Sequence, residues 1–165
     1  MSELPDGPSF DSAKFRQVLG HFPTGVTVVT ALNDGTPVGM AIGSFASLSL
    51  EPAQVLFCPA KTSSSWPKIQ AAGRFCANIL AEDQEDVSRV FASKAEDKFA
   101  EIGWRRSGNG SPIIEGVLAY VDCEIVNVLD GGDHEIVVGQ VQDLEVRHEG
   151  GPLVFYRGGY GRVSL

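Results

Sequence analysis

Apolar residues recur at helical spacing in three short stretches of the chain. Four apolar side chains in residues 10–20 fall on one face of a helix. A second helix is expected to begin at Thr62 or Ser63. A third is expected over residues 82–92, where acidic residues precede an apolar face. Residues 98–104 predict a shorter helix or a turn, so the helical content is small.

β-Branched and alternating segments predict six or more strands. These segments are residues 24–31, 38–45, 54–59, 74–80, 117–129, 135–146 and 153–156. The turn signal Asn33-Asp34-Gly35 joins the first two segments as a hairpin. Strands that are joined by turns, without regular alternation with helices, favour an antiparallel barrel. The expected fold class is therefore mainly β, with short helices that flank or plug the barrel.

The chain of 165 residues carries no internal repeat and no linker-like segment. It predicts one domain over residues 1–165, with residues 1–9 as a short mobile tail. The first residues lack the basic start and apolar segment of a secretory signal. No apolar run reaches the length that a bilayer span needs. A cytoplasmic location is expected.

The chain is acidic, with a formal net charge of −8. This balance argues against nucleic acid and against anionic membrane surfaces as partners, because both select for basic protein faces. Cys58, Cys76 and Cys123 are far apart in sequence, and the three histidines are equally scattered. No zinc-site spacing results, so no metal is expected and the thiols are expected to be reduced core residues.

Hydroxyl side chains are concentrated in residues 44–49, where they are interspersed with apolar ones. This stretch follows the β-branched run at residues 24–30 and precedes Lys61, after which come four hydroxyl residues. Hydroxyls, backbone amides and one lysine can bind a phosphorylated ligand without a basic protein surface. The same pattern is also typical of the polar face of a sheet. A cofactor site is the first hypothesis to test.

Seven segments along the chain carry a family resemblance. They are Phe22–Thr30, Pro37–Met40, Ser44–Pro52, Gly73–Leu80, Asp97–Ala100, Gly132–His134 and Pro152–Gly158. With them, the chain from Phe15 to Tyr160 resembles the short-chain flavin reductases, the reductase components of two-component flavin-dependent monooxygenases. Residues 55–59, 97–100 and 111–116 are most similar to reductases that serve hydroxylases of phenolic rings, including those of steroid-ring catabolism.

The resemblance implies a fold and a reaction. The fold would be the FMN-binding split barrel, an antiparallel six-stranded β-barrel with short helices, and the protein would be a homodimer with flavin near the subunit interface. The reaction would transfer a hydride from NADH or NADPH to FMN or FAD. Reduced flavin would then pass to a separate monooxygenase component. Neither the flavin, nor the nicotinamide, nor the partner's substrate is specified by the sequence.

The resemblance also implies which residues contact the flavin. Thr24, Gly25 and Val26 would lie against the ring, where glycine permits close backbone approach; a buried strand is the plainer interpretation of that run. The ribityl chain and phosphate would be bound by Ser44, Phe45, Ala46, Ser47 and Ser49, followed by Lys61, Thr62, Ser63 and Ser64. The latter run is also typical of a capped helix start. Relatives often carry a hydrogen-bonding side chain where this chain has Gly43.

Six further positions complete the implied site. Asp133 and His134 would lie beside the nicotinamide and flavin rings, with His134 orienting the dinucleotide; a histidine in a turn is otherwise a hydrogen-bonded turn residue. Tyr156 and Tyr160 would edge the pocket, although aromatic core packing also accounts for such residues. Lys98 and Phe99 would reach the flavin, or else be a surface lysine and a core phenylalanine.

Three alternatives to the reductase function remain open on the sequence. A flavin storage or sensor protein would bind flavin without turnover. An oxidase of the pyridoxamine-phosphate type would need basic residues for a second phosphate, and the chain has no evident arginine cluster. A plain barrel that mediates protein contacts would bind no flavin.

Overall fold

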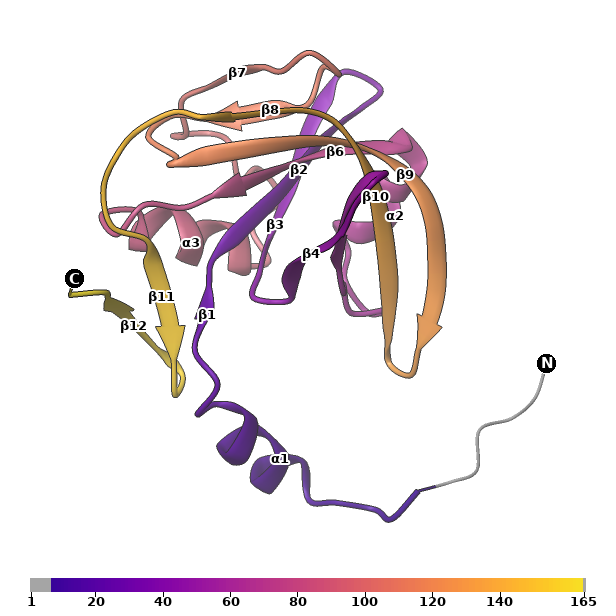
Figure 1. Ribbon diagram of the computed structural model, residues 1–165, viewed down its shortest axis with the longest axis vertical. Coiled ribbons are helices and arrows are strands. Elements are labelled where there is room, and N and C mark those ends of the chain that lie inside the picture. The colour runs from indigo at the N-terminus through magenta and orange to yellow at the C-terminus, as the bar shows by residue number, and fades with distance from the viewer. Residues whose placement is uncertain (1–6, 165) are drawn as a thin grey trace.

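The computed structural model describes residues 7–164 and contains one large antiparallel sheet of seven strands (Figure 1). The strand order is β3-β2-β6-β9-β10-β5-β4, so the late strands β9 and β10 lie between two groups of earlier strands. Of the expected tail over residues 1–9, residues 1–6 lie outside the part of the chain that the structure describes. The strands are β2 (Thr27–Asn33), β3 (Thr36–Ile42), β4 (Phe45–Leu50), β5 (Ala53–Phe57), β6 (Arg74–Ile79), β9 (Ala119–Gly131) and β10 (His134–Val146).

Two smaller antiparallel sheets complete the β structure. The first has the order β1-β11-β12, and the second is the hairpin β7–β8. Their strands are β1 (Thr24–Gly25), β11 (Leu153–Tyr156), β12 (Gly159–Arg162), β7 (Trp104–Arg106) and β8 (Pro112–Ile114). The mainly-β, antiparallel prediction is confirmed, and the sheets are open rather than closed, as in a split barrel. The main sheet has seven strands where six were expected.

Residues 7–164 form three helices: α1 (Ser12–Leu19), α2 (Trp66–Ala72) and α3 (Glu85–Ala92). The Asp11 carboxylate caps α1 by accepting a hydrogen bond from Ala13 N. Gly73 ends α2 with a φ of 75°, a left-handed conformation that favours glycine. Helix α1 stands apart from the sheets (Figure 1) and buries none of its residues.

Two helix starts were predicted too early. Helix α2 begins at Trp66, because the Ser63 hydroxyl accepts hydrogen bonds from the N–H groups of Ser65 and Trp66 and forms the turn before the helix. Helix α3 begins at Glu85, because residues 81–84 form a turn. In that turn the Gln84 side chain accepts a hydrogen bond from Ala81 N and donates one to Glu115 O.

The main sheet packs apolar side chains on both of its faces. On one face, Phe57 contacts both Trp66 and Phe75 in edge-to-face geometry, with ring centroids 5.8 and 4.9 Å apart. On the other face, Phe99 packs between Phe91 and Trp104. Each helix that covers the sheet therefore contributes one large aromatic anchor, Trp66 from α2 and Phe91 from α3.

A buried polar network fixes the β7–β8 hairpin to the sheet. The Asn78 side chain donates to Val28 O and Pro112 O, both at 3.2 Å, and accepts from Ile114 N at 2.9 Å. The Thr30 hydroxyl also donates to Pro112 O, at 2.6 Å. Asn78 and Thr30 are fully buried, so these hydrogen bonds satisfy backbone groups that water cannot reach. The expected strands did not include this hairpin.

Asn78→Ala is expected to lower the free energy of unfolding by about 2–4 kcal/mol, because it leaves buried backbone groups of β2 and β8 without partners and opens a small cavity. Chemical denaturation of both proteins measures the difference. The matched control is Asn127→Ala, at an exposed position of β9, which should change stability by less than about 0.5 kcal/mol. Equal effects of the two substitutions would contradict the role of the network.

Candidate functional site

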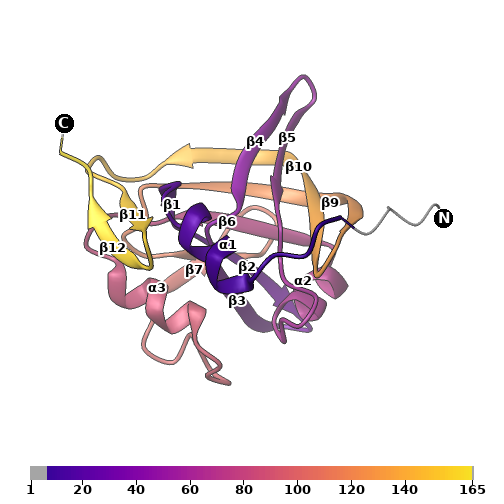
Figure 2. The same cartoon turned by 90° about the horizontal axis from the view of Figure 1, so that it is seen from below.

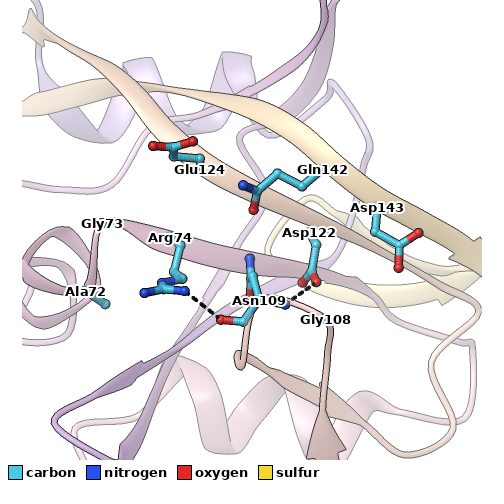
Figure 3. A pocket seen from close by; sticks show the side chains of 9 residues that line it. All are labelled: Ala72, Gly73, Arg74, Gly108, Asn109, Asp122, Glu124, Gln142 and Asp143. Atoms are coloured by element: carbon cyan, nitrogen blue, oxygen red, sulfur yellow. Dashed lines mark hydrogen bonds between the residues drawn. The ribbon is translucent and has the colours of Figure 1, made fainter.

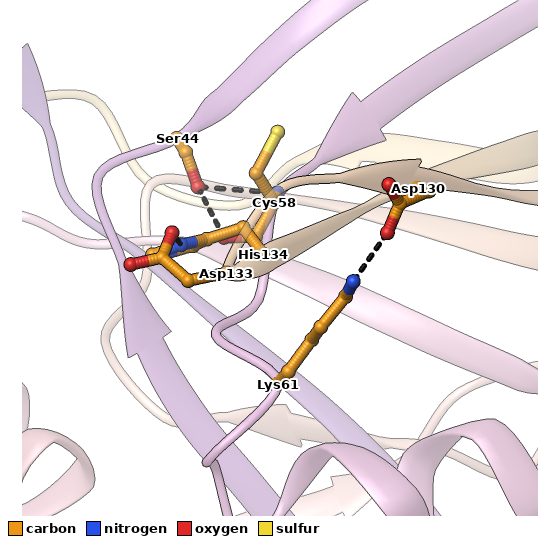
Figure 4. A network of polar contacts seen from close by, with 6 residues as sticks. All are labelled: Ser44, Cys58, Lys61, Asp130, Asp133 and His134. Carbon is orange, nitrogen blue, oxygen red and sulfur yellow. Dashed lines mark hydrogen bonds and ion pairs between the residues drawn. The ribbon is translucent and has the colours of Figure 1, made fainter. Parts of the chain in front are cut away.

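Four of the implied site residues, Ser44, Lys61, Asp133 and His134, lie around the segment that connects β5 to α2. Ser44, between β3 and β4, faces the backbone of Cys58 (Figure 4). The Ser44 hydroxyl donates to Cys58 O and accepts from Cys58 N, both at 3.1 Å. Two of the polar contacts that this hydroxyl can make are thus used within the protein.

The tip of the β9–β10 hairpin lies beside the same segment. Gly132, with a φ of 80°, and Asp133 form its two-residue turn, and His134 is the first residue of β10. His134 is exposed, and its Nδ1 lies 2.8 Å from Asp133 Oδ1. This contact fixes the orientation of the imidazole and lowers the pKa of Asp133, first through the hydrogen bond and then through charge.

Lys61 reaches the hairpin rather than an open pocket. Its ammonium pairs with the Asp130 carboxylate on β9 (Figure 4), and this hydrogen-bonded charge lowers the pKa of Asp130. Both side chains are partly exposed, so the pair is accessible to salt. The adjacent Thr62 is exposed. The positive charge that the sequence suggested for a phosphate is engaged by Asp130.

A cavity of about 410 Å³ beside the start of α2 contains three lysines. Lys98 donates hydrogen bonds to Phe91 O, Gly39 O and Ser65 Oγ at 3.1–3.4 Å. Burial lowers the pKa of Lys98, and the charge of Lys68 lowers it further. An anion in the cavity would relieve this repulsion.

Lys68 and Lys94, which line the lysine cavity together with Ser64 and Ser65, were missed by the sequence analysis. They are surface lysines on separate elements, and only the packing of α2 against the loop after α3 brings them together. Phe99 borders the cavity but is 7% exposed and packs in the aromatic core. The structure thus places the lysine of the Lys98-Phe99 pair at the cavity and the phenylalanine mainly in the core.

The Thr24-Gly25-Val26 run begins beside Gly43, the residue that follows β3. Thr24 and Gly25 form β1, which pairs with β11. Thr24 Oγ1 is buried and has no hydrogen-bond partner. A Cβ at Gly43 would lie 3.0 Å from that oxygen, so the glycine permits this close approach. An unpartnered hydroxyl of this kind is a candidate ligand contact.

A cavity of about 160 Å³ adjoins this run and is lined mainly by apolar residues, including Val26, Gly43 and Phe155. Tyr160 also lines it, and its hydroxyl lies 2.8 Å from Ser88 Oγ. Tyr156 lies elsewhere, at the exposed turn of β11–β12, where its ring meets His21 edge to face at 6.3 Å. Of the two tyrosines, only Tyr160 edges a cavity here.

The implied site residues on β4 lie in different surroundings. Phe45 packs against the first core face, and Ala46 and Ser47 are exposed. Ser49 lies near the end of β4, on the β4–β5 hairpin that projects from the body of the protein (Figure 2). Ser44 and Ser49 are therefore at opposite ends of the strand, and one monomer does not gather all the serines around a single ligand.

A larger cavity of about 700 Å³ contains none of the expected site residues (Figure 3). Its carboxylates are Asp122, Glu124 and Asp143, and Arg74 is its one cation. Burial raises the pKa of Asp122, whose carboxylate accepts a hydrogen bond from Asn109 N at 3.1 Å. This excess of negative charge disfavours a phosphorylated ligand.

Within residues 7–164, no group of three or more potential metal ligands is clustered. In the same part of the chain, no helix is long and apolar enough to cross a membrane.

Comparison with known proteins yields one family. Residues 19–164 match the family described as "Flavin reductase like domain". A flavin reductase from Pseudomonas putida is 54% identical, over 93% of this chain and 91% of that protein. The reductase subunit HsaB of a flavin-dependent monooxygenase from Mycobacterium tuberculosis is 59% identical, over 93% of this chain and 83% of the relative.

Solved structures agree in fold. A homologue of nitrilotriacetate monooxygenase component B from Mycobacterium thermoresistibile is 53% identical, with a TM-score of 0.90 over 92% of this chain and 86% of that chain. The NADH:FAD oxidoreductase SgcE6 of Streptomyces globisporus, in complex with NAD and FAD fragments, is 35% identical, with a TM-score of 0.88 over 93% of both chains.

Proposed function

This chain belongs to the flavin reductase like domain family, and we propose that it supplies reduced flavin to a separate monooxygenase component. It is an NAD(P)H-dependent flavin reductase that uses FMN or FAD. The partner is inferred from relatives that are named reductase subunits of flavin-dependent monooxygenases. HsaB, at 59% identity, supports the resemblance to reductases of steroid-ring hydroxylases.

The observation that carries the proposed binding mode is the unpartnered, buried hydroxyl of Thr24, which lies so close to Gly43 that a Cβ there would be 3.0 Å from it. A bound flavin would supply the ring that accepts the hydride equivalent. Thr24, Gly25 and Val26 would lie against that ring, where the Thr24 hydroxyl gains a partner. Ser44 holds the adjoining backbone in place through Cys58.

The flavin phosphate is assigned to the lysine cavity. Lys98 together with Ser64 and Ser65 would bind it, and Lys68 and Lys94 add positive charge that the sequence analysis did not include. A chain with a net charge of −8 can bind a polyanion here because the lining of this cavity has three lysines and one carboxylate, Glu96. For FAD, the same charges would face the second phosphate.

The nicotinamide is assigned to the hairpin tip. His134 is exposed and is oriented by Asp133, so its free ring nitrogen can donate a hydrogen bond to, or accept one from, the dinucleotide. Its role is to orient the nicotinamide for hydride transfer, an alignment effect that needs no nucleophile.

A homodimer completes the proposed assembly. Helix α1 buries none of its residues in the monomer, and Phe15, Val18 and Leu19 on it are each more than half exposed. The flanking Phe10 and Phe22 are exposed to 69% and 73%. Apolar surface of this extent marks an interface. A second copy would cover α1 and bring further residues, such as those along β4, toward the flavin.

The proposed location is the cytoplasm, in agreement with three free cysteines.

The proposed function predicts NADH or NADPH oxidation that depends on added flavin. Purified protein is assayed with each nicotinamide and with FMN, FAD or riboflavin, because alignment of the two rings is the chemistry that the site supplies. Transfer of reduced flavin is then measured as product formation by an added flavin-dependent monooxygenase. Flavin binding without NAD(P)H oxidation would contradict the reductase and favour a storage or sensor protein.

Lys98→Met is expected to raise the dissociation constant of FMN about tenfold, because the electrostatic attraction between the ammonium and the phosphate is lost. Fluorescence titration measures the constant. Riboflavin, which has no phosphate, is the matched control and should bind both proteins equally. An equal loss of FMN and riboflavin affinity would contradict the phosphate assignment and indicate a general disturbance of the site.

His134→Ala is expected to raise the KM for NAD(P)H about tenfold while the flavin dissociation constant stays constant, since one hydrogen bond to the dinucleotide is lost. Steady-state kinetics and flavin titration give the two values. His148→Ala, at an exposed histidine outside the site, is the control. An unchanged KM and an unchanged hydride-transfer rate would rule out this role of His134.

A further inference from the structure

The part of the β9–β10 hairpin nearest its turn has few neighbours. Strand β10 pairs with β5 only from Val137 to Gln140. Strand β9 pairs with β6 only from Ala119 to Glu124. The end of the hairpin, residues 128–136, is therefore a two-stranded ribbon, and such ribbons are marginally stable by themselves. The position of His134 depends on what else holds this tip.

The segment Cys58–Lys61, here called the strap, holds the tip. Glu135 N donates to Pro59 O at 3.0 Å, and Lys61 N donates to Asp133 O at 2.9 Å. These two backbone hydrogen bonds flank His134 on both sides. At its other end the strap is fixed to Ser44 through the two hydrogen bonds at Cys58 (Figure 4). The strap thus connects the flavin side of the site to the nicotinamide side.

Side-chain contacts add a second attachment. The strap's Lys61 pairs with Asp130, which lies on β9, whereas both backbone hydrogen bonds reach the β10 side of the turn. Helix α2 adds a weaker contact, from Trp66 Nε1 to Glu135 Oε1 at 3.4 Å. The two backbone hydrogen bonds attach the strap only to the β10 side of the tip. The Lys61–Asp130 pair attaches the strap also to β9, and it therefore restricts rotation of the turn about the strap.

We infer that the Lys61–Asp130 ion pair is a positioning contact for NAD(P)H, because it holds the hairpin tip, and with it His134, at a fixed place relative to the flavin segment at Ser44. The inference rests on the proposed placement of the nicotinamide beside His134. Lys61 acts through the tip and not through a bond to the flavin phosphate.

The test uses Asp130→Asn, Lys61→Met and the double variant. Each single substitution raises the KM for NAD(P)H about two- to fivefold, the range expected for an exposed ion pair, with the flavin dissociation constant unchanged. The double variant is no worse than either single variant, because both remove the same contact. Lys61→Arg keeps the wild-type KM. Amide hydrogen exchange over residues 128–136 becomes faster in the single variants.

Glu124→Gln is the matched control, since Glu124 is an exposed carboxylate on the same strand and forms no ion pair within residues 7–164. It leaves the KM and the exchange rates unchanged. An equal KM in wild type and Asp130→Asn would overturn the inference. So would a flavin dissociation constant that rises in Lys61→Met but not in Asp130→Asn, because Lys61 would then bind the flavin directly.

Failure of the proposed reductase function shows as no NAD(P)H oxidation by the wild-type protein. Failure of the proposed nicotinamide placement gives a different pattern. His134→Ala would then leave the KM unchanged, whatever Asp130→Asn does, and the placement of the nicotinamide would be wrong. A raised KM in His134→Ala together with an unchanged KM in Asp130→Asn overturns only the positioning inference.

Discussion

The pairing of β9 with β10 joins the two parts of the main sheet, because β9 continues to β6 and β10 continues to β5. The pairing is possible only where the backbone can approach a crowded core. A Cβ at Gly139 would lie 2.6 Å from the Phe75 ring and 2.9 Å from Cys123 Cβ, so only glycine fits without displacement. The pairing of β9 with β10 shifts register at this glycine. From there it continues to His134, the first residue of β10, and to the turn that contains Asp133.

The same hairpin separates two electrostatic environments. Its tip lies beside the strap and close to residues that are candidates for flavin and nicotinamide contact, whereas its middle borders the acidic cavity of Asp122, Glu124 and Asp143. The lysine cavity beside α2 is distinct from both. A protein with a large net negative charge can therefore bind phosphorylated ligands, because binding depends on the local arrangement of charges and hydroxyls rather than on the total.

Much of the fold could be predicted from the sequence, because the signals were local. The Asn33-Asp34-Gly35 turn forms the β2–β3 hairpin, and the two longest strands were found by their apolar pattern. The β7–β8 hairpin was missed, since its strands have three residues each and are held by Asn78, which is distant in sequence. The late start of α2 was also missed, because a serine before the helix can cap its first N–H or form a preceding turn.

The candidate site was less predictable for a physical reason. The partner of each polar group is set by tertiary structure, so Lys61 was expected at a phosphate and instead pairs with Asp130. The lysine cavity is formed by residues of three elements that have no common sequence pattern. Ser44 precedes β4 and Ser49 lies near the other end of that strand, which a list of hydroxyl residues does not reveal. The family assignment needed only the ordered segments, and it is confirmed.

In the proposed binding mode, one site spans Thr24, the lysine cavity and the hairpin tip. The decisive measurement is a crystal structure of the protein with bound flavin and oxidised nicotinamide dinucleotide. We expect the flavin ring against Thr24-Gly25-Val26, its phosphate beside Lys98, and the nicotinamide beside His134. A flavin bound in the acidic cavity at Asp122, or a nicotinamide remote from the hairpin tip, would contradict it.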